Sequence, residues 1–305
     1  MKPRTLVIIF IILLLVVVAS FYLKKGESTF HSQIVILDSA NVSSIVFAPR
    51  AAQKKEIKLT KEGDGWKMNF DGKSYTADKN LVKQIISELK KVRADRVVAN
   101  NEDKWKDYEI TDSAGVRVQV FEGNKTAADI VIGKFNYNQT SRTPSTYIRV
   151  KGEEKVYSVL GYLSMLFNRQ PNMFRDKTII ESNRNKWTKL TFSYPADSSF
   201  TLTRQENGWL VDGIFTDSAK ITPYLNSIAH LRSSSFIDDK DVIAVRPEFT
   251  IKIEGDSLGD ITVSAAPADT INKYIVTSSV NKDAYFSGAK ENLFTRLFVS
   301  KSKFE

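Results

Sequence analysis

The hydrophobic positions of the chain form one continuous run, followed by many short patterned stretches. The run extends from Leu6 to Leu23, and eighteen helical residues span about 27 Å, close to the hydrocarbon core of a bilayer. Two lysines end it. We therefore predict a transmembrane anchor over residues 1–25. A signal peptide cleaved after Ala19 or Ser20 is the alternative, because small residues stand at that point.

Positive charges flank the run on both sides and do not decide its orientation. Lys2 and Arg4 precede it, and Lys24 and Lys25 follow it. A short tail before a first helix usually stays in the cytoplasm, and long domains are translocated regardless of charge. We expect the N-terminus inside and the rest outside, which in a bacterium places the protein on the periplasmic side of the inner membrane. Residues 26–41 are expected to form a juxtamembrane stalk.

Two later stretches have the 3.6-residue spacing of an amphipathic helix. Their apolar positions are Leu81, Ile85, Leu89 and Val92 in the first, and Ile221, Leu225, Ile228 and Leu231 in the second. Asp78 and Asp217 stand at the start of each, where a carboxylate accepts hydrogen bonds from the free N–H groups of a first helical turn. The spacing and these N-caps predict two helices in corresponding places.

The two helices belong to a sequence pattern that occurs twice in the chain. LTKEGDGWKM at residues 59–68 returns as LTRQENGWLV at residues 202–211, with Trp66 and Trp209 in the same place. The other matching segments are VSSIVF and KWTKLTF, AGVRVQV and PEFTIKI, ADIVIG and GDITVS, TYIRV and KYIVT, VYSVL and AYFSG, and YLSMLF and NLFTRLF. Most of them alternate with period two, as half-buried strands do. We expect both tryptophans to cover the edge of a core.

These elements predict an α+β fold of two tandem similar units. The connections between strands are too short for parallel crossovers, so the strands should be mostly antiparallel. Each unit has one amphipathic helix and a short terminal helix. The first unit is expected over residues 42–180 and the second over residues 181–305, beginning with the polar segment ESNRNK.

The amino-acid composition limits the kinds of partner and functional site that the chain is expected to have. The net charge is +9, but basic and acidic side chains are mixed along the chain, so a nucleic-acid partner is not expected. The chain has no cysteine, which removes disulfides, thiolate zinc sites and cysteine nucleophiles. Its two histidines, His31 and His230, have no second ligand at metal-binding spacing. We predict no catalytic, cofactor-binding or metal-binding residue. His230 still leaves a Ser-His-Asp arrangement open, although no G-x-S-x-G motif is present.

One segment has a composition suited to contacts with a partner or ligand. FNYNQTSRTPSTY, residues 135–147, is long for a hairpin connection and mixes aromatic, amide and basic side chains. Its candidate contact residues are Phe135, Tyr137, Arg142 and Tyr147. Two further segments are expected to be solvated: DDKD at residues 238–241, and the basic helix face formed by Lys83, Lys90, Lys91 and Arg93.

The chain resembles the bacterial domain-of-unknown-function family 4340. The resemblance is carried by Gly-Trp after an LT[KR] strand, Thr76–Asp78 before a helix, the alternating segment Tyr108–Val120, and DIVIG at residues 129–133, followed by YIRV and VYSV. It covers residues 42–180 well and 187–300 more loosely, where Ser264 replaces Gly133. The resemblance implies a membrane-anchored protein that assists an ABC-type transport system, and it supplies no catalytic residues.

Three functions are consistent with these features. The first is a non-enzymatic, membrane-tethered extracytoplasmic module that contacts a protein partner in a cell-envelope complex, with an ABC-type transport system as the candidate. The second is a binding module for envelope glycan or another small ligand, using residues 135–147. The third is a hydrolase whose site is built from carboxylates, because scattered Asp and Glu residues do not exclude one.

Overall fold

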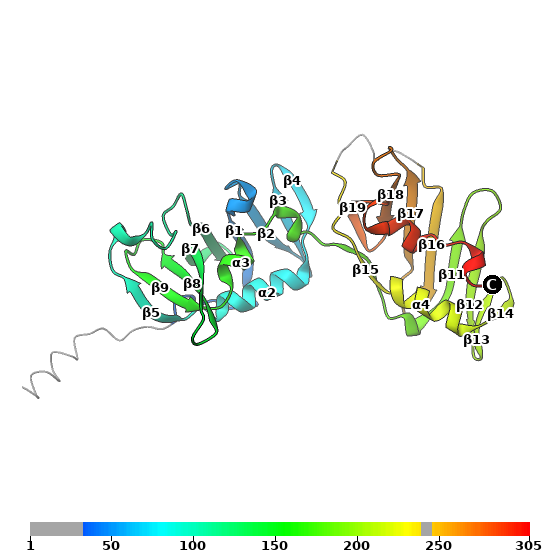
Figure 1. The fold of residues 1–305 in the computed structure, drawn as a ribbon, viewed down its shortest axis with the longest axis horizontal. Helices are drawn as coiled ribbons and strands as arrows, with labels where there is room; N and C mark the ends of the chain where they lie inside the picture. Colours follow the sequence, from blue (N-terminus) through cyan, green and yellow to red (C-terminus); the bar gives the residue numbers. More distant parts are fainter. Residues whose placement is uncertain (1–32, 239–245) are drawn as a thin grey trace, which may run out of the picture.

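The computed structural model describes residues 33–238 and 246–305. The predicted anchor and the first part of the predicted stalk lie outside these residues. Within them, no helix combines the length and the hydropathy that a membrane crossing requires. Two sheet-containing units follow one another along the longest axis of the molecule (Figure 1).

The first unit is built on a nine-stranded sheet with the order β4-β3-β2-β1-β6-β7-β8-β9-β5. Its strands are β1 (Val42–Phe47), β2 (Ile57–Glu62), β3 (Gly65–Phe70), β4 (Lys73–Thr76), β5 (Ala94–Ala99), β6 (Val116–Glu122), β7 (Lys125–Asn138), β8 (Thr143–Val150) and β9 (Val156–Leu160). Its helices are α2 (Lys79–Lys90) and α3 (Leu163–Phe167), with short 3₁₀ turns at Arg50–Ala52, Glu102–Lys104 and Pro171–Met173.

The second unit repeats this order in an eight-stranded sheet, β14-β13-β12-β11-β16-β17-β18-β19. Its strands are β11 (Trp187–Ser193), β12 (Phe200–Gln205), β13 (Gly208–Val211), β14 (Ile214–Thr216), β16 (Phe249–Gly255), β17 (Ile261–Pro267), β18 (Tyr274–Ser278) and β19 (Asn281–Ser287). Its helices are α4 (Ser218–Ile228) and α5 (Leu293–Leu297), with 3₁₀ turns at Arg184–Lys186, Lys290–Asn292 and Lys301–Lys303. In both sheets the paired strands are antiparallel, as predicted.

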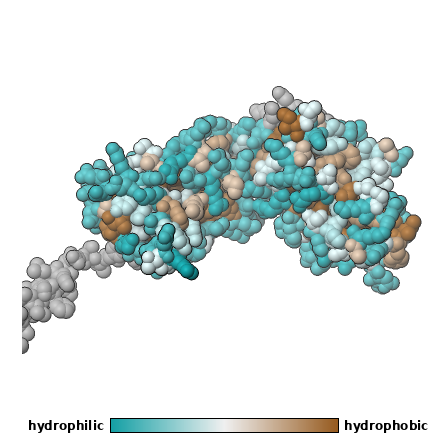
Figure 2. Space-filling view, in the orientation of Figure 1, coloured by the Kyte–Doolittle hydropathy of each residue, from teal (hydrophilic) through white to brown (hydrophobic). Residues whose placement is uncertain are grey.

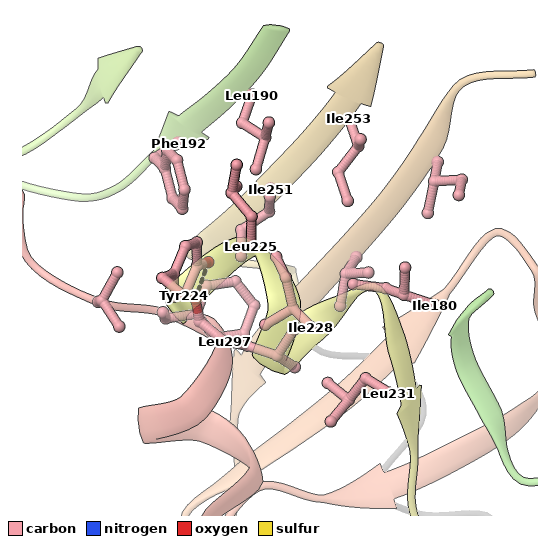
Figure 3. Packing of buried hydrophobic residues seen from close by; sticks show 14 of the residues in the cluster. Ile180, Leu190, Phe192, Tyr224, Leu225, Ile228, Leu231, Ile251, Ile253 and Leu297 are labelled. Carbon is pink, nitrogen blue, oxygen red and sulfur yellow. Dashed lines mark hydrogen bonds between the residues drawn. The ribbon is translucent and has the colours of Figure 1, made fainter. Parts of the chain in front are cut away.

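Each long helix begins at its predicted N-cap and turns its apolar face to its own sheet. Asp78 accepts hydrogen bonds from the backbone N–H groups of Asn80 and Leu81, and Asp217 accepts one from Ala219. In the second unit, Tyr224, Leu225 and Ile228 of α4 pack on β11 and β16, and the Tyr224 hydroxyl donates to the Leu297 carbonyl at 2.7 Å (Figure 3). The predicted caps are therefore confirmed, and so is the helix spacing as far as Leu89 and Ile228. Val92 and Leu231 were wrongly placed in the helices, because α2 ends at Lys90 and Leu231 lies in a short strand after α4.

The two tryptophans also occupy equivalent places. Trp66 and Trp209 are each 8% exposed, and each belongs to the core of its own unit. Each follows a glycine that begins a strand, β3 in the first unit and β13 in the second. Both tryptophans therefore lie at the margin of a core, as their position in the repeated phrase predicts.

Two features at the ends of the first unit do not follow from the repeat. Part of the predicted stalk packs on this unit, because Val35 and Leu37 are buried in its core and the Ile34 N–H donates to the Val92 carbonyl. At the other end, β10 (Thr178–Glu181) pairs with β15 (His230–Arg232) of the second unit. Ile179 and Ile180 are buried in the second core, although both precede the predicted boundary between residues 180 and 181.

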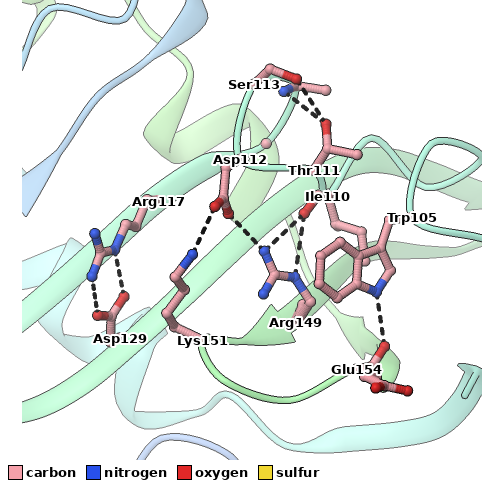
Figure 4. Close-up of polar contacts among 12 residues, drawn as sticks. Trp105, Ile110, Thr111, Asp112, Ser113, Arg117, Asp129, Arg149, Lys151 and Glu154 are labelled. Carbon is pink, nitrogen blue, oxygen red and sulfur yellow. Dashed lines mark hydrogen bonds and ion pairs between the residues drawn. The ribbon is translucent and has the colours of Figure 1, made fainter. Parts of the chain in front are cut away.

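A segment between α2 and β6 covers the second face of the first sheet. Trp105, Tyr108 and Ile110 pack there against β7, β8 and β9. Figure 4 shows Trp105 and the Ile110 carbonyl beside the guanidinium of Arg149. Arg149 is 2% exposed, lies 3.8 Å from the ring of Trp105, and donates to the Ile110 carbonyl and to Asp112. A buried guanidinium needs such partners because an unpaired charge in the interior is strongly destabilising.

Asp112 links this cluster to the solvent and makes its stability depend on pH. The hydrogen bond from Lys151 holds the Asp112 pKa below its usual value, and Arg149 adds to the effect. A carboxylate whose pKa is lowered by folding stabilises the fold above its unfolded pKa, about 3.9, and this contribution is lost as the pH falls through the folded pKa. We expect Asp112→Asn to be less stable to urea than the wild type at pH 7, and we expect this difference to shrink as the pH falls below about 3.9. A difference that persists undiminished at pH 3 would contradict this role.

Candidate functional site

The junction between the two units is organised around a second buried arginine. Phe174 packs in the first core, and Arg175 then bridges to Ala77 beside the end of β4. The side chain of Arg175 is 3% exposed. Its guanidinium lies 4.0 Å from the ring of Tyr75 in the first unit and 3.7 Å from the ring of Phe236 in the second. One cation therefore joins an aromatic ring from each unit.

Asp238 of the second unit balances the charge of Arg175. Both carboxylate oxygens accept from Nη1 of Arg175 at 2.9 Å, and Asn172 accepts from the same nitrogen at 3.3 Å. Burial lowers the pKa of Arg175, and Asp238 opposes this shift. Burial and the charge of Asp238 raise the pKa of Tyr75, against the effect of Arg175. The Tyr75 hydroxyl therefore stays protonated at neutral pH and is able to donate a hydrogen bond.

Further polar contacts cross the junction on either side of the arginine. Asp283 of β19 accepts from Thr76 at 3.1 Å and forms an ion pair with Lys67. The hydrogen bond from Lys67 holds the pKa of Asp283 below its usual value. Arg232 of β15 lies 2.5 Å from Asp78, the N-cap of α2. The β4 edge of the first unit is thus held against β15 and β19 of the second.

A cleft of about 490 Å³ opens beside the junction. Its lining combines apolar and aromatic side chains with amides, one lysine and one carboxylate: Ala51, Ala52, Gln53, Lys55, Met68, Phe70, Tyr75, Gln170, Pro171, Asn172 and Asp238. Most of this wall comes from the first unit, and Asp238 is the contribution of the second. The charges are already paired, because Lys55 binds Asp71 at 2.9 Å and Asp238 binds Arg175. An uncharged polar molecule with an apolar face fits this lining best.

The four predicted contact residues do not form one surface. The segment predicted as a long loop is a hairpin in which β7 and β8 pair as far as Asn138 and Thr143, so the prediction of a loop was wrong. The physical reason is that its polar residues alternate on an exposed strand end, which composition alone does not distinguish from a loop. The residues between the strands, 139–142, include Arg142, whose backbone is in the left-handed region.

The aromatic members of this set lie on opposite faces of the sheet. Phe135 pairs across the ladder with Thr146 and stacks on Tyr162, with ring centroids 5.7 Å apart. Tyr137 shares that face and is 48% exposed. Tyr147 follows Thr146 and therefore points to the other face, where its ring lies 4.6 Å from that of Tyr108. Of the four, only Tyr137 and Arg142 are exposed at the tip of the hairpin.

The other singled-out residues have structural partners or are exposed. Nδ1 of His230 lies 2.8 Å from a carboxylate oxygen of Glu181 on the surface of the small β10–β15 sheet. Asp238 belongs to the junction, whereas His31 and residues 239–241 lie outside the described residues. The four basic residues on and just after α2 are exposed, as predicted, and Lys91 pairs with Glu88. Among the residues with described positions, no three His, Asp and Glu side chains gather as metal ligands would.

The residues of the junction gave little signal in the sequence. Arg175 and Asp238 stand in polar stretches that indicate solvated loops, and their pairing spans 63 positions. Tyr75 immediately precedes the Thr76–Asp78 motif, and its residue type alone does not predict a contact with a buried cation. A buried ion pair between distant segments has no local period, so only the folded chain reveals it.

The sequence matches a protein family over residues 70–247, which is more than half of the chain. The family is described as Domain of unknown function (DUF4340). The chain belongs to this family. The DUF4340 match begins at Phe70, the last residue of β3, and ends before β16, so it includes both long helices and the junction between the units. Comparison with curated proteins and with solved structures gave no match.

The matched range differs from the extent of the resemblance noted in the sequence. The DUF4340 match includes Thr76–Asp78, Tyr108–Val120 and the DIVIG segment. It leaves out the Gly-Trp phrase of the first unit and reaches only to residue 247 of the second. The family description gives no activity, so chemistry has to be inferred from the cleft and the surfaces of this chain.

Proposed function

We propose that the protein is a non-enzymatic binding module of the cell envelope that takes a small, neutral, hydroxylated ligand into the cleft beside its junction. The observation that carries this proposal is the lining of the cleft, where aromatic rings face amides and the charged groups already have partners. Aromatic faces pack on the C–H faces of sugars, and amides bind hydroxyl groups as both donors and acceptors. An envelope saccharide has both features.

The proposal includes the membrane tether and the duplication that the sequence predicts. Residues 1–25 would anchor the chain in the inner membrane, with residues 26–305 on the periplasmic side. The strand order that the two sheets share, apart from the additional edge strand β5 of the first, supports two tandem copies of one unit, with the cleft at their junction. Release of the protein from membranes by a wash at high pH would contradict the tether.

Calorimetric titration of the purified full chain with soluble glycan fragments from peptidoglycan tests the cleft. We expect Phe70→Ala and Gln170→Ala each to weaken binding about tenfold, because each removes one packing or hydrogen-bonding contact with the ligand. Tyr137→Ala is the matched control, since it removes an exposed aromatic ring from the hairpin once predicted to bind. Loss of binding in Tyr137→Ala, with full binding in both cleft variants, would overturn the proposal and favour the hairpin. No binding by the wild type would also overturn it.

A protein partner in an envelope complex, with an ABC-type transport system as the candidate, is the second proposed function. It is favoured by a separate observation, which is the exposure of two adjacent hydrophobic residues on β14 at the end of the second unit. Ile214 is 71% exposed and Phe215 is 61% exposed. They are successive residues of an edge strand, so they present apolar side chains on both faces of that edge, and exposed apolar surface commonly marks protein contacts.

A further inference from the structure

The repeated strand order allows the surroundings of β14 to be compared with those of β4. Both are edge strands at the same end of their sheets, and each leads into the N-cap of a long helix. Counting back from the N-caps Asp78 and Asp217, Tyr75 corresponds to Ile214 and Thr76 to Phe215. The strand pairing agrees, because Tyr75 pairs with Met68 and Ile214 pairs with Val211. Met68 and Val211 each lie two residues after the tryptophan of the repeated phrase.

The β4 edge is covered in the folded chain. Tyr75 packs on Arg175, Thr76 donates to Asp283, and Lys67 pairs with the same aspartate. The second unit therefore serves as the partner of the first unit at this edge. This contact shows which surface of the repeated unit is suited to docking.

The β14 edge is not covered by any of the described residues in the way that β4 is covered. Its residues are also more apolar than those at the β4 edge. Leu210 corresponds to Lys67, so the three positions Lys67, Tyr75 and Thr76 become Leu210, Ile214 and Phe215. A hollow of about 330 Å³ adjoins them, lined by Val211, Ile214, Phe215, Thr216, Asp217, Lys220, Lys301, Phe304 and Glu305. Hydrophobic side chains reach the surface at the end of the molecule where Figure 1 places β14, on a face that is otherwise mostly hydrophilic (Figure 2). The replacement of ion-pairing groups by apolar ones indicates a partner with an apolar complement.

A second copy of this chain does not offer that complement. In the second unit, the surface that receives β4 includes the edge of β19. The corresponding strand of the first unit is β9, and β5 pairs along it from Ala94 to Ala99. The strand that closes this edge carries the exposed charges of Asp95 and Arg96. Adding one copy to another in the manner of the internal junction is therefore blocked by a charged strand.

We propose that Leu210, Ile214 and Phe215 form a docking surface for a different protein, which presents apolar side chains from an open sheet edge. The surface deepens the second proposed function, the partner in an envelope complex, and does not depend on the cleft. Its geometry is that of the β4 junction, with apolar packing in place of the ion pair between Lys67 and Asp283.

Site-specific crosslinking in membranes of the native host tests this surface. A photoreactive phenylalanine analogue replaces Phe215 in the full chain, and in separate controls it replaces the exposed residues Ile271 and Ile36, each 73% exposed. We expect one adduct with a different protein from position 215 and none from the controls. The crosslinked peptide of the partner should map to an apolar edge strand. An adduct of two copies, equal adducts from the controls, or no adduct would overturn the proposal.

Affinity purification from detergent-solubilised membranes tests separately whether the protein has a partner and whether that partner binds at β14. The double variant Ile214→Ser/Phe215→Ser should recover the partner at about one tenth of the wild-type level or less, because buried aromatic anchors dominate binding. Ile271→Ser should recover it fully, and all variants should keep the unfolding midpoint of the wild type. If the double variant recovers the partner fully, the proposed surface is wrong but the partner function stands. If the wild type recovers no partner, the partner function itself fails.

Discussion

Replacing Arg175 with alanine is expected to separate the unfolding of the two units. The guanidinium contacts an aromatic ring from each unit and pairs with Asp238, so its loss removes two cation–π contacts and an ion pair at once. We expect the junction to lose about 2–3 kcal/mol, a value near the lower end for buried pairs because Asp238 is partly exposed and regains water. A single cooperative transition should then become two.

Urea unfolding followed by tryptophan fluorescence measures this effect, because each unit contains tryptophans. Arg142→Ala is the matched control, since it removes an arginine from the exposed tip of the β7–β8 hairpin. Arg175→Lys is expected to recover only part of the loss, because an ammonium lacks the planar face that lies between the two rings. One transition with the wild-type midpoint in Arg175→Ala would show that the two units are held together by other contacts.

Substituting alanine for Gly133 is the second change with a large expected effect. A Cβ at this position would overlap the carbonyl oxygen of Tyr108 and lie 2.5 Å from Cγ2 of Ile110. Both atoms belong to the segment that covers Arg149, so the substitution forces that cover away from β7. We expect a loss of about 2–4 kcal/mol in the free energy of unfolding.

Gly259→Ala is a matched control in the second unit. A Cβ there would meet nothing within 4 Å, and the backbone is outside the left-handed region, so we expect a change within about 0.5 kcal/mol. Thermal unfolding of both variants by calorimetry decides the matter. Equal midpoints for Gly133→Ala and the wild type would mean that the cover packs less closely than the structure indicates.

Strand register gives Gly133 a different counterpart from the one that the matching segments suggest. The segments ADIVIG and GDITVS align Gly133 with Ser264. The pairs Val118–Ile130 and Ile251–Val263 occupy corresponding places in the two sheets, so the residue that corresponds to Gly133 is Ala266. A methyl group is therefore accommodated at this place in the second sheet.

The elements that the sequence predicted are those set by local periodicity. The strands around Ile45 and Leu190, the helix caps and the two tryptophans all follow from spacing within one segment. The prediction failed where polar residues serve distant contacts. Arg149 and Arg175 are charged residues that composition assigns to solvent, and both are buried by aromatic rings that lie far away in sequence.

Alignment of the repeats shows the same limit in a smaller way. In SYTAD (residues 74–78) and IFTD (residues 214–217), an aromatic residue precedes a threonine, which aligns Tyr75 with Phe215. Strand register and the N-caps instead align Thr76 with Phe215. A shift of one residue moves a side chain to the other face of a strand. Alignment by residue type alone therefore assigns the wrong counterpart to Phe215, the central residue of the proposed docking surface.

The segment that connects the two units is held closely by hydrogen bonds to both of them. Asp176 donates its N–H to the Thr76 carbonyl and accepts from Asn281, and the Lys177 carbonyl accepts from Ser233, so each step of the crossing is fastened to one unit or the other. Such a connection does not stretch under force as a flexible linker between domains does. The two units would move together as one stiff body, and a displacement at β14 would be transmitted to the first unit with little loss.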